Sequence, residues 1–148
     1  MEEAKKKRVL IIEDDKLLAL VEGKLISKLG YNVVGKASTG EEAVRMTSEL
    51  NPDILVVDIS LNGEMDGIET VENIREHSSI PVIYLSGNSD NFNFERAKKT
   101  GFVSYLVKPI TQDELKAPLE KASSQDSEMA TSASQYSIQR RRATNYAG

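Results

Sequence analysis

Short apolar runs alternate along the chain with longer stretches in which apolar residues recur at helical spacing. The short runs are rich in valine, isoleucine and leucine, which is typical of strands buried on both faces of a parallel sheet. They span residues 9–12, 32–34, 54–57, 81–85 and 102–107. Strand and helix patterns follow one another in five regular β–α units. Because right-handed crossovers join parallel strands, this order predicts an α/β fold with a doubly wound sheet and helices on both faces.

The expected helices have recognisable starts and ends. The first ends at Gly30, and its apolar face consists of Leu17, Leu18, Val21, Leu25 and Leu29. Two helices begin with the spacing of a capping box, at residues 39–42 and 111–114, and Asp66 is the expected N-cap of a third. Residues 92–99 predict a short helix that Gly101 closes.

Pro118 interrupts the last expected helix. Because proline removes a backbone donor and crowds the preceding turn, we expect a kink or an early end there. Beyond residue 121 the sequence is rich in Ser, Thr, Ala and Gln and has few large apolar residues. We therefore divide the chain into a folded domain, residues 1–121, and a tail, residues 122–148, that we expect to be disordered or weakly helical.

The composition narrows the classes of function. A length of 148 residues suits one domain. The absence of cysteine excludes disulfides and thiolate metal sites, and the single histidine excludes a zinc site built on several histidines. The apolar runs are much shorter than the roughly 20 residues of a membrane span. The N-terminus also lacks the pattern of a signal peptide, so we expect a cytoplasmic protein.

Polar side chains follow four of the expected strands. They are Glu13-Asp14-Asp15, Asp58, Ser86-Gly87 and Lys108-Pro109. The carboxyl ends of the strands share one edge of a doubly wound sheet, where ligands bind. Carboxylates gathered there repel one another unless a cation neutralises them, and Mg²⁺ prefers such oxygen ligands. Together with a lysine and a hydroxyl, the cluster suits the transfer of a phosphoryl group to a carboxylate.

Five motifs in this order make the chain similar to the response-regulator receiver domains of two-component signalling, of the chemotaxis-regulator type. The resemblance covers about residues 7–121. The motifs are Val-Leu-Ile-Ile-Glu-Asp-Asp (9–15), Asp-Ile-Leu-Val-Val-Asp-Ile-Ser-Leu (53–61), Met-Asp-Gly-Ile-Glu (65–69), Pro-Val-Ile-Tyr-Leu-Ser-Gly (81–87) and Tyr-Leu-Val-Lys-Pro (105–109). The resemblance implies a flavodoxin-like sheet of five parallel strands in the order 2-1-3-4-5, with five helices. It also implies phosphorylation that depends on Mg²⁺, with Mn²⁺ as an alternative ion.

The resemblance also assigns roles to residues by position, with Asp58 as the phosphoacceptor. The implied metal ligands are Glu13, Asp14, Asp58 and the backbone carbonyl of Ser60. The implied phosphoryl contacts and switch residues are Ser86, Lys108 and Tyr105. Supporting positions are Pro109, for which a cis peptide bond is expected, Gly87 and Asn88. Asp15 is expected to cap the first helix.

The implied partners are a sensor histidine kinase or phosphotransfer protein, which donates the phosphoryl group, and an output protein of unknown identity. We expect no DNA-binding domain in residues 122–148 and no membrane partner. A homodimer is one possible assembly, although Pro118 argues against a dimer formed through the fourth helix, fifth strand and fifth helix. Since neither Ser60 nor Asn88 is an acid able to activate water, we expect the phosphorylated state to last minutes rather than seconds.

Three alternatives would use an α/β fold differently. A pseudo-receiver would bind partners without being phosphorylated, but the complete set of site residues favours a phosphoacceptor. A flavodoxin would need a phosphate loop rich in Ser, Thr and Gly after the first strand, where this chain has three acids. A phosphatase of the haloacid-dehalogenase type would need an Asp-x-Asp motif there, which the chain lacks.

Overall fold

Five parallel strands form one sheet in the order β2-β1-β3-β4-β5, as predicted. The structure, a computed structural model, describes residues 5–87 and 91–125. The strands are β1 (Arg8–Ile12), β2 (Asn32–Ala37), β3 (Ile54–Asp58), β4 (Val82–Ser86) and β5 (Ser104–Val107). Asp58 pairs with Leu85, and Ser86 pairs with Val107. The strand register therefore brings the polar strand ends to one edge of the sheet.

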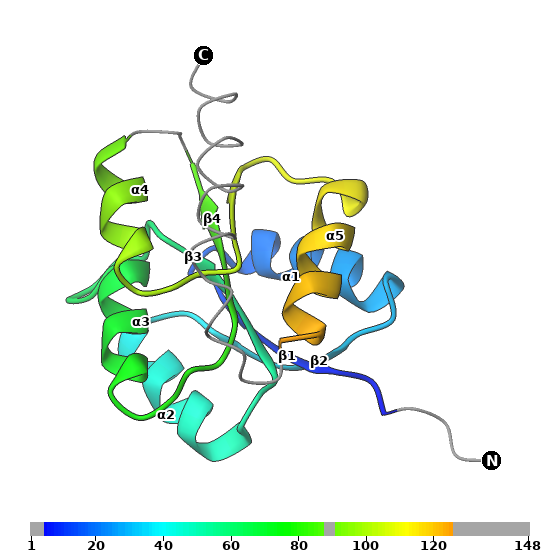
Figure 1. Ribbon diagram of the computed structural model, residues 1–148, viewed down its shortest axis with the longest axis horizontal. Coiled ribbons are helices and arrows are strands. Elements are labelled where there is room, and N and C mark those ends of the chain that lie inside the picture. The colour runs from blue at the N-terminus through cyan, green and yellow to red at the C-terminus, as the bar shows by residue number, and fades with distance from the viewer. Residues whose placement is uncertain (1–4, 88–90, 126–148) are drawn as a thin grey trace.

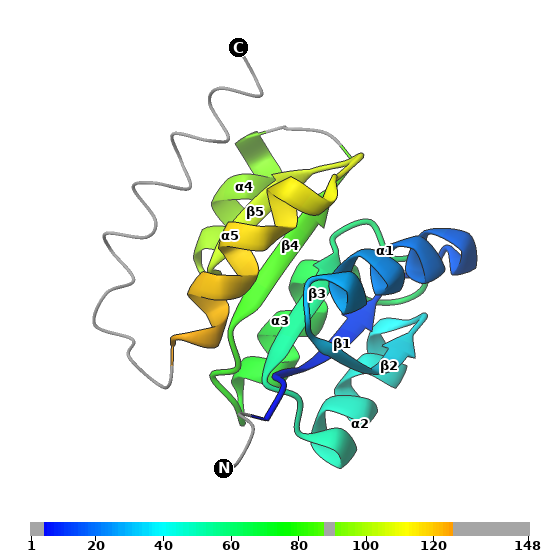
Figure 2. The same ribbon diagram turned by 90° about the vertical axis from the view of Figure 1, so that its right-hand side faces the viewer.

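Helices cover both faces of the sheet (Figures 1 and 2). One face carries α1 (Lys16–Lys28) and α5 (Gln112–Ser123). The other carries α2 (Gly40–Leu50), α3 (Gly67–Arg75) and α4 (Asn91–Lys98). This arrangement confirms the predicted doubly wound α/β fold.

The strands supply two separate cores because successive side chains point to opposite faces. In β4, Val82 and Tyr84 belong to the core under α2, α3 and α4, whereas Ile83 and Leu85 belong to the core under α1 and α5. The three central strands are buried along their whole length apart from Arg8 of β1. Strand β2 lies at an edge and is only partly buried, and it continues to Ala37 instead of ending at residue 34.

Most helix ends follow the expected capping chemistry. Asp15 and Thr39 accept hydrogen bonds from the first turns of α1 and α2. Reciprocal capping boxes open α3 at Asp66 and α5 at Thr111. The reciprocal bond predicted for α2 is wrong, because the Glu42 carboxylate accepts from the Ser38 backbone N–H at 2.7 Å instead of reaching back to the N-cap residue itself.

Helix α1 buries a different face from the predicted one. Leu17 is 69% exposed, Leu18 is 37% exposed and Val21 is 44% exposed, so the prediction was wrong for this half of the helix. The buried residues are Ala19, Glu22, Gly23 and Ile26. Two of them, Ala19 and Gly23, are small and let the helix lie close to the sheet, since a Cβ atom on Gly23 would be 3.2 Å from the side chain of Lys36 and 3.7 Å from that of Ile11. The large apolar residues in the first half of α1, Leu17, Leu18, Leu20 and Val21, therefore face outward.

Helix α5 runs through Pro118 to Ser123, so the predicted early end is wrong. Pro118 is buried in the helix, and the neighbouring Leu115 and Leu119 belong to the core under α1 and α5. Burial of a leucine side chain stabilises a fold by about 1.5–3 kcal/mol, which offsets the single hydrogen bond that proline removes. The residues of the predicted tail beyond 125 lie outside the described part of the chain.

Candidate functional site

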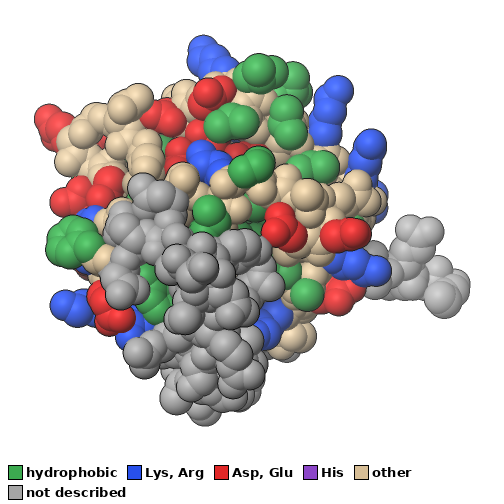
Figure 3. Space-filling model, turned by 90° about the horizontal axis from the view of Figure 1, so that it is seen from above, with side chains coloured by type: hydrophobic (Ala, Val, Ile, Leu, Met, Phe, Trp, Pro, Cys, Tyr) green, Lys and Arg blue, Asp and Glu red, His purple; other side chains and the backbone are tan. Residues whose placement is uncertain are grey.

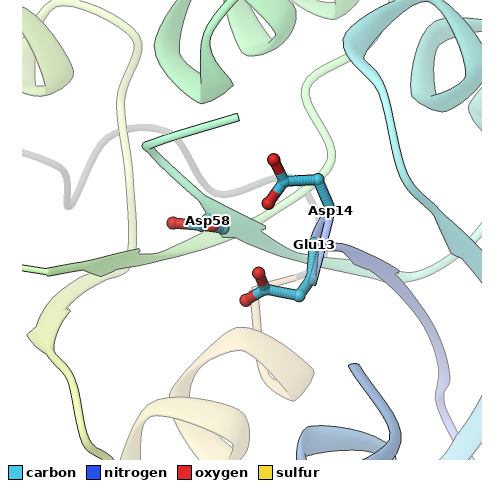
Figure 4. Close-up of side chains that lie close together, drawn as sticks. All are labelled: Glu13, Asp14 and Asp58. Carbon is cyan, nitrogen blue, oxygen red and sulfur yellow. The ribbon is translucent and has the colours of Figure 1, made fainter. Parts of the chain in front are cut away.

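Three acidic side chains lie together at the carboxyl edge of the sheet (Figure 4). Asp58 ends β3, and Glu13 and Asp14 follow the neighbouring strand β1. Glu13 and Asp14 point to opposite sides, as successive residues of an extended chain do, and Asp58 lies beside both. One carboxylate oxygen from each residue lies within 4.8 Å of those of the other two. The structure thus brings the three acids together, as the strand order predicted.

Asp58 is held in a closely packed position. It is 3% exposed, and its Oδ1 accepts a hydrogen bond from the Ser60 backbone N–H at 3.1 Å. Gly67, which opens α3, lies against the Asp58 backbone, so that any Cβ there would collide with it. Burial, and then the nearby charge of Glu13, raise the pKa of the Asp58 carboxyl to about 6.

Glu13 and Asp14 differ in their surroundings. The Glu13 side chain is fully buried, and its Oε2 accepts from the Asp15 backbone N–H at 3.2 Å. Asp14 is partly exposed, and its Oδ2 accepts from the Asn62 backbone N–H at 3.0 Å. Asp14 therefore ties the end of β1 to the loop that follows Asp58.

Lys108 brings positive charge to the acids. Its Nζ lies 3.4 Å from both Asp58 Oδ1 and Glu13 Oε1. Burial lowers the pKa of Lys108, but Asp58 and Glu13 outweigh this effect and raise it. The Lys108 backbone N–H donates to the Ser86 carbonyl at 2.7 Å, and the peptide bond to Pro109 is cis, as expected. Acidic and basic side chains lie side by side on the upper face of the molecule, with hydrophobic side chains grouped next to them (Figure 3).

The predicted switch residues lie in the last two strands, Ser86 in β4 and Tyr105 in β5. Ser86 ends β4 and is 2% exposed, whereas Gly87 is exposed. The Tyr105 ring is 1% exposed and packs edge-on against Phe94, with ring centroids 5.1 Å apart. Asn88 lies outside the described residues.

Comparison with known proteins decides the family. Residues 9–120 match the response regulator receiver domain, which is more than half of the chain. The chain belongs to the response regulator receiver domain family. This placement agrees with the strand order and with the acidic strand ends, and it confirms the resemblance seen in the five motifs.

Individual receiver proteins support the placement. Over 114 residues the chain is 37% identical to the probable C4-dicarboxylate response regulator DctR of Halalkalibacterium halodurans, covering 76% of this chain and 49% of that protein. Over 118 residues it is 34% identical to the chemotaxis protein CheY of Thermotoga maritima, covering 79% of this chain and 98% of CheY. The chain therefore spans about half the length of DctR but matches nearly all of CheY.

Solved structures give the same result. The signal receiver domain of a modulated diguanylate cyclase from Desulfovibrio desulfuricans superposes with a TM-score of 0.75 at 39% identity, covering 80% of this chain and 94% of that one.

Within the described residues, none of the helices combines the length and the apolar character needed to cross a membrane.

Receiver domains bind Mg²⁺ at an acidic site, and the residues of this receiver domain fit such an ion. Glu13, Asp14 and Asp58 each offer a hard oxygen ligand within a space that one cation can bridge. The pKa of the Asp58 carboxyl is raised, by burial first and by Glu13 second, although the nearby Lys108 lowers it. These three carboxylates would hold the ion, which would supply the missing positive charge.

Glu22 is a buried acid near the site that sequence reasoning missed. It is 3% exposed on the inner face of α1, and its charge interacts with Glu13, Lys108 and Asp58. Glu22 also lines, with Lys108, a mostly apolar groove of about 330 Å³ between α1 and the segment after β5. The sequence does carry a signal for Glu22, because it lies three residues after Ala19 and four before Ile26. This helical spacing places Glu22 on the buried face of α1 once that face is identified correctly.

Proposed function

We propose that this receiver domain accepts a phosphoryl group on Asp58 in a reaction that depends on Mg²⁺, and that phosphorylation switches the binding of an output protein. The observation that carries the proposal is the position of Asp58, whose Oδ1 lies 3.4 Å from Lys108 Nζ within a group of three carboxylates. With a pKa of about 6, the Asp58 carboxyl is mostly ionised at neutral pH and is available as a nucleophile.

The chemistry is a transfer of one phosphoryl group. An oxygen of the Asp58 carboxylate attacks phosphorus and forms an acyl phosphate. The bond between phosphorus and the donor atom breaks, and its electron pair leaves with the donor. Lys108 is placed to pair with an oxygen of the transferred group, and the Ser60 N–H keeps the Asp58 carboxylate oriented. Bound Mg²⁺ supplies further positive charge for the phosphoryl oxygens.

The switch follows from the charge that the acyl phosphate adds, roughly two negative charges beside Lys108. We propose that the hydroxyl of Ser86 contacts the phosphoryl group. We also propose that the buried ring of Tyr105 changes its packing in the neighbouring core in response. Two packings of these side chains would differ in population before and after phosphorylation. The output protein would then bind one of them in preference to the other.

Membership of the family implies a histidine kinase or a phosphotransfer protein as the donor. We place the protein in the cytoplasm, and we assign the receiver function to residues 1–121 and no fixed role to residues 122–148. Family membership does not specify which protein is the donor or the output protein. Since the chain spans about half of relatives such as DctR, the activity of the whole protein is part of this proposal.

Intact mass spectrometry tests the proposal. The protein is incubated with Mg²⁺ and a small acyl-phosphate donor, beside Asp58→Asn and a matched control, Asp113→Asn, which changes an exposed aspartate of α5. We expect wild type and the control to gain one phosphoryl group, and Asp58→Asn or a chelator to prevent the gain. After removal of the donor, the gain should decay over minutes.

A folded wild-type protein that gains no mass with Mg²⁺ present would contradict the proposal and favour a pseudo-receiver. Retention of the gain in Asp58→Asn would place the phosphoryl group elsewhere. Loss of the phosphoryl group within a few seconds would contradict the expected lifetime.

A further inference from the structure

A second groove, which shares no residue with the acid cluster, lies between α1 and the edge strand β2 (Figure 2). Its volume is about 440 Å³. The residues that line it include Lys24, Lys28 and Lys36 beside Leu20 and Val33. No acidic residue of the described chain lines it, although the whole chain has a net charge of −4. The groove is therefore a local patch of positive charge on an acidic protein.

The three lysines are not neutralised by neighbouring side chains. Within residues 5–87 and 91–125, none of them forms an ion pair with a carboxylate. Lys24 and Lys28 lie one helical turn apart on α1, which is about 6 Å along the helix axis. This separation is shorter than the Debye length of about 8 Å at physiological ionic strength. An anion in the groove would therefore be attracted by both charges together.

The side chain of Lys36 lies across the groove against α1. On the sheet, Lys36 pairs with Ile11, which belongs to the core under α1 and α5. A Cβ atom on Gly23 of α1 would be 3.2 Å from Lys36 Cε and 3.6 Å from its Nζ. Because Gly23 has no side chain, the ammonium group of Lys36 has room beside the helix. The third positive charge is thus directed toward the two on α1.

The stability of the fold accounts for only one of these lysines. Lys28 lies in the last turn of α1, where positive charge interacts favourably with the helix dipole. Lys24 lies one turn earlier, and like charges four residues apart destabilise a helix. Lys36 adds a further charge on the sheet face where its neighbour Ile11 is buried. An arrangement that costs stability in this way is expected where a ligand of opposite charge binds.

The shape of the groove favours an extended segment of a protein as the ligand. Leu20 and Lys28 are eight residues apart on α1, or about 12 Å, a length that three or four extended residues span. An edge strand such as β2 presents unpaired backbone groups to an extended segment. Leu20, which is 47% exposed, adds apolar contact between the charges. A nucleic acid would extend beyond the groove and meet the acidic remainder of the protein.

We propose that the groove between α1 and β2 binds an acidic segment of a partner protein, whose carboxylates pair with Lys24, Lys28 and Lys36. The proposal does not depend on phosphorylation of Asp58, because none of the groove residues belongs to that site. The affinity is modest and falls as salt is added, since each exposed ion pair contributes little and is screened.

Titration of the whole chain with a short acidic peptide tests the proposal. The probe is a capped six-residue peptide of alternating glutamate and alanine, and its control has glutamine in place of glutamate. Backbone amide signals in NMR spectra at low ionic strength report where the peptide binds. We expect the glutamate peptide to shift the signals of residues 20–28 and 33–36, and the glutamine peptide to shift none of them.

Two double variants with the same net charge separate a local site from a general effect of charge. Lys24→Gln/Lys36→Gln changes the groove, whereas Lys99→Gln/Lys116→Gln removes two exposed lysines elsewhere. From the usual contribution of exposed ion pairs, we expect the groove variant to raise the Kd of the glutamate peptide about fivefold. The control variant should stay within about twofold of wild type.

Several outcomes would overturn the proposal. They are no binding of the glutamate peptide, shifts that lie mainly outside the groove, equal binding of the glutamine peptide, and equal weakening in both double variants. Two further probes identify a different ligand. Tighter binding of an oligothymidylate with the same charge would assign the groove to nucleic acid, and tighter binding of pyrophosphate would assign it to a small anion; either result would replace the acidic segment as the ligand.

Discussion

Two groups of buried polar side chains lie on opposite faces of the same sheet, and they are satisfied to different degrees. Under α2, α3 and α4, the Thr100 hydroxyl donates to the Ala97 carbonyl at 2.7 Å, and the Tyr84 hydroxyl meets the Thr100 oxygen at 2.7 Å. Under α1 and α5, the acids Glu13, Glu22 and Asp58 gather around Lys108.

The hydroxyl pair stabilises the fold, whereas the acid cluster serves the proposed chemistry. Thr100 donates its hydroxyl proton to the Ala97 carbonyl, so Tyr84 is the donor of the bond to Thr100 and both hydroxyls of this pair have a partner. In the acid cluster, burial raises the pKa of Asp58 and of Glu22, so that ionisation of each carboxyl at neutral pH opposes folding. This cost falls where we expect a cation and a phosphoryl group to bind.

The largest expected effect comes from Asp58. Its folded pKa of about 6 lies above the ordinary value of about 3.9. The folded protein therefore binds more protons than the unfolded chain between these values. The stability contributed by this group is complete below about pH 4 and is lost as the pH rises through about 6. In chelator at pH 7, we expect Asp58→Asn to raise the free energy of unfolding by about 2–3 kcal/mol.

Urea unfolding of wild type and Asp58→Asn across this pH range measures the effect. The difference in the free energy of unfolding between the two proteins should grow as the pH rises from 4 to 7, because this range spans the ordinary and the raised pKa of Asp58. Asp113→Asn, on the exposed face of α5, serves as the control and should show no such trend. A difference that is the same at every pH would show that the Asp58 pKa is not raised.

A smaller effect of opposite sign is expected on the other face. Thr100→Val keeps the shape of the side chain but leaves the buried Tyr84 hydroxyl without its acceptor. A buried donor that loses its partner costs about 1–3 kcal/mol, so the free energy of unfolding should fall by about 2 kcal/mol. Thermal or urea unfolding at pH 7 measures the change.

The double variant Tyr84→Phe/Thr100→Val sharpens this test. Removal of both partners leaves no orphaned donor on Tyr84, so the double variant should be more stable than Thr100→Val alone. If the double variant is the less stable of the two, the hydroxyl pair does not have the energetic role assigned to it.

The sheet and the three metal-binding acids could be predicted because their signals are local or follow from topology. Uninterrupted runs such as residues 54–57 suit strands covered on both faces, and strand order then brings Asp58 beside Glu13. The caps at Asp66 and Thr111 depend only on neighbours three residues apart, and both formed as predicted.

The face of α1 could not be predicted because large apolar residues dominate a hydrophobic pattern. Ala19, Gly23 and Ile26 define the buried stripe, and two of them are small. Glu22 was missed for the same reason, since an acid is expected on the outer face of a helix. Pro118 shows the same limit, because tertiary packing kept α5 helical where local propensity favoured an end.

We infer that the cluster of Glu13, Asp14 and Asp58 is a cation site, in which a bound ion would balance negative charge that Lys108 leaves. The direct measurement is the unfolding midpoint at pH 7 as Mg²⁺ is raised, for wild type and Asp58→Asn. The midpoint of wild type should rise steadily, because binding adds about 2.7 kcal/mol to the free energy of unfolding when free Mg²⁺ reaches about one hundred times its Kd. The midpoint of Asp58→Asn should rise less. A midpoint of folded wild type that does not respond to Mg²⁺, or an equal rise in both proteins, would show that Asp58 is not part of a cation site.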